Sequence, residues 1–249
     1  MTMMKPLAAA VALTLTCCAL TSCGKVQAEE SLTVFAAASL KKSFEKIGKD
    51  FEEETGTAVT FNFAGSSGLV EQMKSGAPAH VFASADEPTM ETASQAGLVH
   101  DPRIFATNTL TIAVPEGNPA NVTNLESLTQ PGVKVAVCAP AVPCGNATKQ
   151  VMDRAGVSLK PATEESKVTA VLTKVESGQV DAGLVYVTDA RASDKVEAVD
   201  FPQAAEVVNR YPIAVTSQGE KTESAAKFVE FVLSERAQQV LQTNGFGQP

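Results

Sequence analysis

The chain has 249 residues, a formal net charge of −8 at pH 7, 44% hydrophobic residues and only 5% aromatic residues. An acidic chain with few aromatics lacks the positive charge that neutralises nucleic-acid phosphates, so no nucleic-acid partner is expected. If a leader is removed from the N-terminus, the residues that remain suffice for one large or two medium domains.

The N-terminus is predicted to be an export signal. Lys5 supplies its positive charge, and residues 6–20 form an apolar stretch too short for a comfortable membrane span. The segment Leu20-Thr21-Ser22-Cys23-Gly24 resembles the lipobox of bacterial lipoproteins, which implies removal of residues 1–22 and lipidation of Cys23. An ordinary cleaved signal with an incidental cysteine is the alternative. Residues 23–30 then form a polar, lipid-anchored tether.

Two runs rich in β-branched and aromatic residues, 32–40 and 59–69, each stop at small residues and a serine before a helical pattern begins. In the first helix one apolar face is predicted, formed by Leu40, Phe44, Ile47 and Phe51. Ser39 is the natural N-cap of this helix and Gly56 the stop. The second helix is predicted to run from Ser66 or Ser67 to Gly76. A serine at such a turn stays beside free backbone N–H groups, an arrangement that receives anions.

Strand and helix patterns alternate through the rest of the chain. Strands are predicted at 80–83, 110–115, 133–137, 183–187 and 213–215, and helical segments at 88–96, 127–128, after 144–145, after Ser166 and over 224–242. This alternation predicts an α/β fold with mostly parallel sheets. No single linker divides the chain, so two halves are expected to be joined by strands crossing near 109–112 and 210–213.

Cys138 and Cys144 are the cysteines left after the leader and Cys23 are set aside. They frame Ala-Pro-Ala-Val-Pro, where two prolines favour a tight turn. A disulfide closing this turn suits an oxidising compartment and would stabilise the chain by about 2 kcal/mol. Two buried thiols are the alternative.

Several helix starts share free N–H donors: Ser39, Ser66-Ser67, Cys144-Gly145 and 166–168. Tyr186, at the end of an apolar strand, adds a phenol. Converging neutral donors can hold a tetrahedral dianion without a counter-charge. Each element alone is usually a simple cap or a core tyrosine, and only their combination on an exported chain favours a binding site.

The motifs extend this reading. The runs 33–40, Phe63-Ala64-Gly65-Ser66-Ser67-Gly68-Leu69, Gly76-Ala77-Pro78-Ala79 and Phe82-Ala83-Ser84-Ala85-Asp86, in that order, resemble the ModA family of molybdate-binding proteins. These proteins supply ABC importers. The similarity continues through Val142-Pro143-Cys144-Gly145 and Gly183-Leu184-Val185-Tyr186, and so covers nearly the whole exported chain.

The resemblance implies a two-lobed type II periplasmic-binding fold with a cleft between lobes joined by crossing strands. The first lobe would comprise 31–111 and 210–249, and the second 112–209. The ligand set implied by the family begins with Ser39, through its hydroxyl and backbone N–H, and with Ser66, for which Ser67 is a close competitor. It is completed by the backbone N–H groups of Cys144 and Val168 and the phenol of Tyr186. Cys144 stands where the family commonly has alanine, a change that keeps the backbone donor.

The function implied is capture of molybdate or tungstate and delivery to an ABC permease by a monomer without a cofactor. Molybdenum would enter only as molybdate. The protein would be exported and lipid-anchored at Cys23, facing the periplasm or extracytoplasmic space. Sulfate or phosphate is the alternative ligand. No matched position is acidic, whereas phosphate keeps a proton at neutral pH and would want a carboxylate acceptor. The sequence does not rank molybdate against tungstate.

An enzyme is the main rival class. Gly65-Ser66-Ser67-Gly68 departs from the G-x-S-x-G turn of nucleophilic serines. His80 and His100 occupy no recognisable base position and are expected at the rim or surface. No spaced Cys/His cluster suggests a resident metal. We therefore expect a binding protein and no catalysis.

Overall fold

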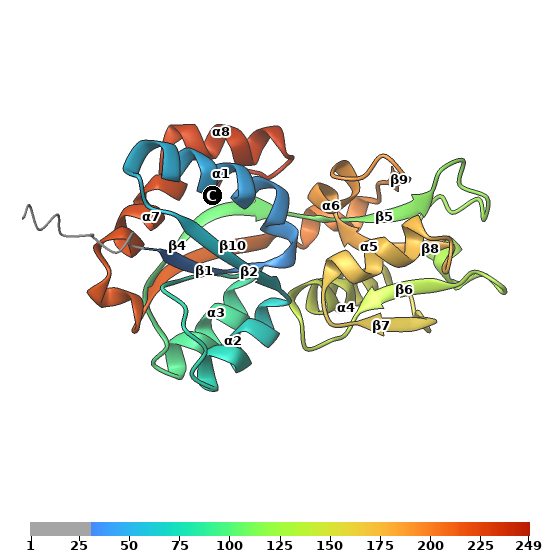
Figure 1. Ribbon diagram of the computed structural model, residues 1–249. Helices are drawn as coiled ribbons and strands as arrows, with labels where there is room; N and C mark the ends of the chain where they lie inside the picture. The colour runs from blue at the N-terminus through green and yellow to red at the C-terminus, as the bar shows by residue number, and fades with distance from the viewer. Residues whose placement is uncertain (1–30) are drawn as a thin grey trace, which may run out of the picture.

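The computed structural model describes residues 31–249, which form two α/β lobes side by side, each built on a five-stranded sheet (Figure 1). The predicted signal peptide 1–22, the tether 23–30 and the lipidation site Cys23 lie outside the described residues. Among residues 31–249, none of the helices combines the length and the apolar character that a membrane span requires.

The sheet of the first lobe has the strand order β2-β1-β3-β10-β4. Its strands are β1 (Leu32–Ala37), β2 (Val59–Ala64), β3 (Val81–Ala83), β4 (Val99–Asn108) and β10 (Asn209–Thr216). Strand β1 is parallel to β2 and β3, and β10 is antiparallel to β3 and β4.

The sheet of the second lobe has the order β7-β6-β8-β5-β9. Its strands are β5 (Leu110–Pro115), β6 (Val135–Cys138), β7 (Thr163–Glu165), β8 (Ala182–Tyr186) and β9 (Val196–Val199). Strand β6 is parallel to β7 and β8, and β5 is antiparallel to β8 and β9. The prediction of mostly parallel sheets is wrong, because β5 and β10 each arrive from the other lobe and run against their neighbours.

Helices cover both faces of each sheet. Those of the first lobe are η1 (Ala38–Leu40), α1 (Lys41–Thr55), α2 (Ser66–Lys74), α3 (Glu87–Gln95), η4 (Gly219–Lys221), α7 (Glu223–Leu233) and α8 (Glu235–Thr243). Those of the second are η2 (Glu126–Thr129), α4 (Pro143–Ala155), α5 (Val168–Glu176), α6 (Val187–Arg191) and η3 (Pro202–Glu206). In the first lobe α1, α7 and α8 lie on one face of the sheet and α2 and α3 on the other (Figure 1).

The single helix predicted over 224–242 is two helices. Ser234 has an extended backbone (ψ 157°), which ends α7, and its hydroxyl accepts a hydrogen bond from the N–H of Ala237 as the N-cap of α8. The chain turns there because a capping serine satisfies one of the free donors of a new helix.

The predicted apolar face of α1 is confirmed, because its phenylalanines enter an aromatic core. Phe44 and Phe51 are fully buried and both contact Phe228 of α7, with ring centroids 6.2 and 5.2 Å apart. Gly56 ends α1 as predicted, in the left-handed conformation (φ 73°) that glycine adopts without strain.

The chain passes from the first sheet to the second at Thr109, between β4 and β5, and returns where β10 begins at Asn209. These are the two regions where crossing strands are predicted. Asn209 and Asn108 are partners in the antiparallel pairing of β10 with β4, so both crossings lie together at the junction of the lobes. The lobe ranges 31–111, 112–209 and 210–249 stay a prediction.

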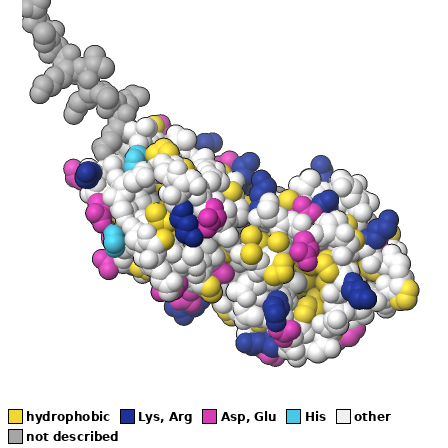
Figure 2. All heavy atoms as spheres, turned by 90° about the horizontal axis from the view of Figure 1, so that it is seen from below, with side chains coloured by type: hydrophobic (Ala, Val, Ile, Leu, Met, Phe, Trp, Pro, Cys, Tyr) yellow, Lys and Arg dark blue, Asp and Glu magenta, His cyan; other side chains and the backbone are white. Residues whose placement is uncertain are grey.

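Charged side chains are mixed on the surface. On the face drawn in Figure 2, lysine and arginine side chains are interspersed with aspartate and glutamate side chains over both lobes. Charge of one sign therefore does not accumulate on that face.

Candidate functional site

A small cavity lies between the lobes where strand-to-helix turns of both sheets meet. Its volume is about 10 Å³. The residues that line it are Ala37, Ala38, Ser39, Ala64, Gly65, Ser66, Ala85, Val142, Pro143, Cys144, Lys167, Val168 and Tyr186. The structure thus brings together five of the six predicted ligand-binding residues, and leaves out Ser67.

Ser39 lies in η1, between β1 and α1, and its role as an N-cap is a wrong prediction. The N-cap position of α1 is Leu40, and no side chain caps that helix. The Ser39 hydroxyl lies 3.0 Å from the phenol oxygen of Tyr211 instead. Tyr211 lies on β10, so the Ser39 hydroxyl at the cavity wall is positioned by a residue distant in the sequence and not by its own helix.

Ser66 and Ser67 are the first two residues of α2 but point in different directions. Ser66 is buried, and its hydroxyl accepts a hydrogen bond from the N–H of Ala85 at 3.1 Å. The Ser67 hydroxyl donates to the carbonyl of Ala141 in the other lobe at 2.6 Å. The structure therefore places Ser66 at the cavity and Ser67 at a contact between the lobes.

Cys144 lies in the first turn of α4, directly after Pro143, the first residue of that helix. The predicted disulfide is present, with a bond between Cys138 and Cys144. Backbone N–H groups in the first turn of a helix have no partner within it, so the N–H of Cys144 is a donor available at the cavity. The disulfide ties this turn to the end of β6.

Val168 is the first residue of α5, and Lys167 occupies the N-cap position without a side-chain bond to the helix. The prediction that Ser166 caps this helix is wrong. The carbonyl of Ser166 faces the first lobe instead, so close to Gly65 that a Cβ built on Gly65 would lie 2.2 Å from it. The start of α5 therefore approaches the start of α2 across the cleft.

Tyr186 ends β8, and its buried phenol lines the cavity. Its oxygen accepts a hydrogen bond from Nδ2 of Asn209 at 3.0 Å. Burial raises the pKa of Tyr186 well above its usual value, and the nearby Tyr211 and Asp86 act in the same direction. The phenol therefore remains protonated and can donate at any physiological pH.

Three polar residues behind this wall were missed by the sequence reasoning: Asn108, Asn209 and Tyr211. All three are buried, and they hydrogen-bond to Thr188, Ser39, Ala85 and Tyr186 at the junction of the lobes. The available signal was an asparagine directly before each of the two predicted crossing segments, Asn108 before 109–112 and Asn209 before 210–213. It becomes meaningful only once the strands are known to pair.

No carboxylate lines the cavity, and within residues 31–249 no cluster of His, Cys, Asp or Glu could hold a metal ion. The polar groups at the cavity are hydrogen-bond donors. They are the hydroxyls of Ser39 and Ser66, the phenol of Tyr186, the N–H groups at the starts of α4 and α5, and Lys167. A wall of such donors suits an anion whose oxygens all accept. Among the described residues, no histidine lines the cavity either.

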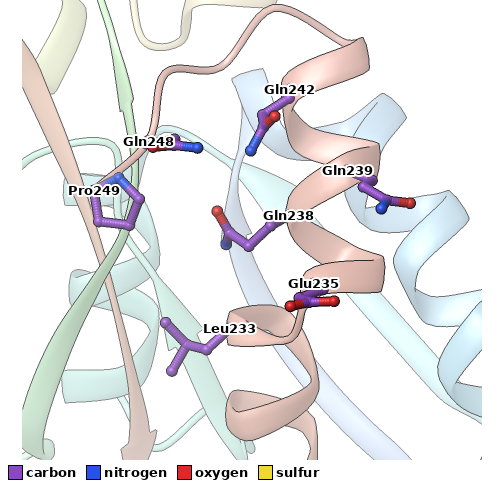
Figure 3. Close-up of a pocket in the computed structure, with 7 residues that line it drawn as sticks. All are labelled: Leu233, Glu235, Gln238, Gln239, Gln242, Gln248 and Pro249. Carbon is purple, nitrogen blue, oxygen red and sulfur yellow. The ribbon is translucent and has the colours of Figure 1, made fainter.

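A larger groove of about 520 Å³ lies along α8 near the C-terminus (Figure 3). Its polar side chains are mostly glutamines, and Gln238 points inward from α8. The Gln238 amide already donates to the carbonyls of Phe105 and Val232. This groove lacks the converging donors of the smaller cavity.

Neither histidine lies at the cavity. His80 accepts a hydrogen bond from the N–H of Thr33 at 3.0 Å beside β1. His100 is exposed and lies 3.6 Å from Glu220. Both therefore have local partners away from the cleft, as expected for rim or surface residues.

The architecture defines the class of protein: this is the two-lobed type II fold of periplasmic binding proteins. Residues 32–247 match the family described as bacterial extracellular solute-binding proteins. The chain is 46% identical to the molybdate-binding protein ModA of Mycobacterium tuberculosis over 229 residues, 91% of this chain and 88% of that protein. The chain belongs to the bacterial extracellular solute-binding protein family, and the predicted family and fold class are confirmed.

Solved structures support the same fold. The periplasmic molybdate-binding protein of Azotobacter vinelandii superposes with a TM-score of 0.77 at 22% identity, covering 88% of this chain and 99% of that one. A sulfate-binding protein of Mycobacterium tuberculosis gives 0.74 at 21% identity, covering 87% and 86%. At these identities the likeness concerns the fold alone.

Proposed function

We propose that this protein is an extracytoplasmic solute-binding lipoprotein that captures molybdate or tungstate and delivers it to an ABC permease. The observation that carries the proposal is the cavity between the lobes, whose lining includes the hydroxyl groups of Ser39, Ser66 and Tyr186 and the helix starts at Cys144 and Val168. The similarity to proteins named for molybdate binding supports the choice of anion.

The ligand set we propose is that implied by the sequence motifs. Ser39 supplies its hydroxyl and backbone N–H, Ser66 its hydroxyl, Cys144 and Val168 their backbone N–H groups, and Tyr186 its phenol. Donors from these five residues of both lobes surround a tetrahedral dianion and neutralise it through partial charges. We assign Ser67 to the contact between the lobes.

Closure of the lobes is part of this proposal. A cavity of about 10 Å³ is at the limit for a single water molecule. A four-oxygen anion therefore enters when the lobes separate at the crossing strands, and they then close on it.

Selectivity follows from the donors and the size of the site. Hydrogen phosphate carries a proton and finds no carboxylate acceptor on the wall. Sulfate has the right charge but is smaller than molybdate, so donors spaced for molybdate leave its hydrogen bonds long. A site for sulfate or phosphate is the alternative function.

The remaining parts of the proposal concern the setting of the protein. Cys23 carries the lipid anchor after removal of residues 1–22, and residues 23–30 tether the two lobes to the membrane. The protein acts as a monomer without a cofactor and without catalytic activity. Its partners are the anion and the permease of an importer.

The test is thermal unfolding of residues 24–249 with molybdate, tungstate, sulfate or phosphate added separately. A ligand at one hundred times its dissociation constant adds about 2.7 kcal/mol to the stability of the folded state. We expect a large upward shift with molybdate and tungstate and little with the other two. An equal shift with sulfate would favour the alternative, and no shift with any anion would contradict oxyanion binding.

A further inference from the structure

Two buried asparagines lie directly behind the cavity wall, at the junction of the two lobes. Asn108 is the last residue of β4 and Asn209 the first of β10, and the two are paired in the antiparallel register. Each hydrogen-bonds to residues of both lobes. Their amide groups are therefore placed to act on both halves of the site.

The amide of Asn209 uses both of its protons. Its Nδ2 donates to the carbonyl of Ala85 at 3.1 Å and to the phenol oxygen of Tyr186 at 3.0 Å. Its Oδ1 is buried and has no hydrogen-bond partner within residues 31–249. Turning the amide over would set that oxygen against the Ala85 carbonyl, oxygen facing oxygen, so the orientation is fixed.

The fixed amide decides what Tyr186 offers to the cavity. Because the phenol oxygen accepts from Asn209, its own proton must go to another acceptor. The phenol lines the cavity and lies beside Tyr211, so that proton goes either to the Tyr211 phenol or to a ligand. When a ligand fills the cavity, Asn209 thus favours Tyr186 as a donor at the wall.

The hydrogen bond from Asn209 to Tyr186 forms one arm of this arrangement, and a second arm runs from Asn108 through Tyr211 to Ser39. The Asn108 Nδ2 donates to the hydroxyl of Thr188 at 2.8 Å and more weakly to the phenol oxygen of Tyr211 at 3.4 Å, and the Asn108 Oδ1 accepts from the N–H of Thr109. The Tyr211 phenol lies 3.0 Å from the Ser39 hydroxyl. Either oxygen of the pair formed by Ser39 and Tyr211 can be the donor; the amide of Asn108 favours the direction in which Tyr211 donates to Ser39, and the proton of Ser39 is then directed into the cavity.

We propose that Asn209 and Asn108 are positioning residues that set the direction of these hydroxyl protons, so that Tyr186 and Ser39 present donors only and reject a protonated oxyanion. This inference rests on the proposed function, because it explains how the same site discriminates. A neutral hydroxyl can normally donate or accept. Fixing its direction from behind removes the acceptor that hydrogen phosphate needs, without placing any charge beside the anion.

The test is a double-mutant cycle measured by calorimetric titration of the mature chain with molybdate. We expect Asn209→Leu and Tyr186→Phe each to weaken binding about tenfold, the range for hydrogen bonds to a charged group. If Asn209 acts through the phenol, the double variant binds within about twofold of Tyr186→Phe alone. Losses that multiply to about a hundredfold would overturn the inference, because a structural role of Asn209 does not depend on the Tyr186 hydroxyl.

The matched control pairs Asn209→Leu with Ser39→Ala, which lies on the other arm. Here the losses are expected to multiply. A second variant, Asn209→Ala, removes the amide behind Tyr186 without adding bulk or charge, and serves if the leucine variant does not fold. Without the amide the Tyr186 hydroxyl can turn to accept, so the ratio of molybdate to phosphate affinity should fall at least tenfold. An unchanged ratio would overturn the inference.

The wild-type titration separates the two claims. Wild type that binds molybdate, together with a multiplicative cycle, leaves the proposed function intact and contradicts the role of Asn209. Wild type that binds no molybdate contradicts both.

Discussion

Gly65 of the first lobe faces the backbone carbonyl of Ser166 of the second lobe, and a Cβ on Gly65 would lie 2.2 Å from that oxygen. The backbone of Gly65 is extended, with φ −62° and ψ 134°, a conformation that any residue adopts. Position 65 therefore needs glycine because the two lobes approach each other there, and not because the backbone of the first lobe requires glycine.

The first prediction concerns this approach. Gly65→Ala should fold with normal stability but hold the lobes apart, and so weaken molybdate binding at least tenfold, since backbone atoms cannot yield to the added methyl group. Titration calorimetry together with thermal unfolding measures both properties. Gly68→Ala is the matched control, because a Cβ there meets no atom within 4 Å. It should leave binding unchanged and stabilise α2 by about 1 kcal/mol. Tight binding by Gly65→Ala would contradict lobe closure at this contact.

The second prediction distinguishes the two serines that begin α2. Ser66→Ala should weaken molybdate binding at least tenfold, because it removes a hydroxyl from the cavity wall. Ser67→Ala should weaken it only about threefold, because it loses one neutral hydrogen bond that joins the closed lobes. Dissociation constants of the two variants check this order. A greater loss from Ser67→Ala would reverse the assignment.

The third prediction concerns the disulfide. The variant Cys138→Ser with Cys144→Ser should lose about 2 kcal/mol of unfolding free energy, because a short closed loop is released in the unfolded chain. Molybdate should still bind, since the backbone N–H at position 144 remains. Denaturant unfolding and titration measure the two quantities. A folded double variant that binds no anion would show that the loop geometry, and not only the N–H, forms the site.

The fourth prediction concerns pH. Asp189 of α6 is buried, and burial raises its pKa to about 7, while its hydrogen bond from the Tyr186 N–H acts in the opposite direction. The folded chain therefore holds this proton more tightly than the unfolded chain. Its contribution to stability is full below about pH 4 and is lost as the pH rises through about 7.

Asp189→Asn keeps an acceptor for the Tyr186 N–H and cannot ionise. As the pH rises from 4 to 8, the free energy of unfolding of Asp189→Asn should increase relative to that of the wild type by on the order of 2–4 kcal/mol. Denaturant unfolding across this range tests the gain, with Asp153→Asn on the exposed side of α4 as the control. Parallel profiles for wild type and Asp189→Asn would show that Asp189 does not titrate in this window.

Local sequence patterns predicted much of the fold because their causes are local. The apolar spacing of α1 and its glycine stop at Gly56 need no distant partner. The break between α7 and α8 had a local signal as well, because Ser234 is a residue type that caps helices. The amphipathic pattern continues through Ser234, and so the sequence favoured one long helix. The direction of β5 and β10 depends on which lobe each strand comes from, which no local pattern contains.

The site shows the same division. The turns carrying Ser39, Ser66, Cys144 and Val168 were recognisable as strand-to-helix turns before their convergence was visible. The orientation of Ser39 was not, because its partner Tyr211 lies 172 residues further along the chain. Asn108 and Asn209 carry no pattern of their own, and they matter because two crossing strands set them side by side.

The most direct test of the central claim is the position of tungsten in crystals of the protein grown with tungstate, located by its anomalous scattering. The account predicts one strong peak between the lobes, within hydrogen-bonding distance of the hydroxyls of Ser39 and Ser66 and the N–H groups of Cys144 and Val168. A peak in the groove along α8, or no ordered tungsten in the cleft, would contradict it.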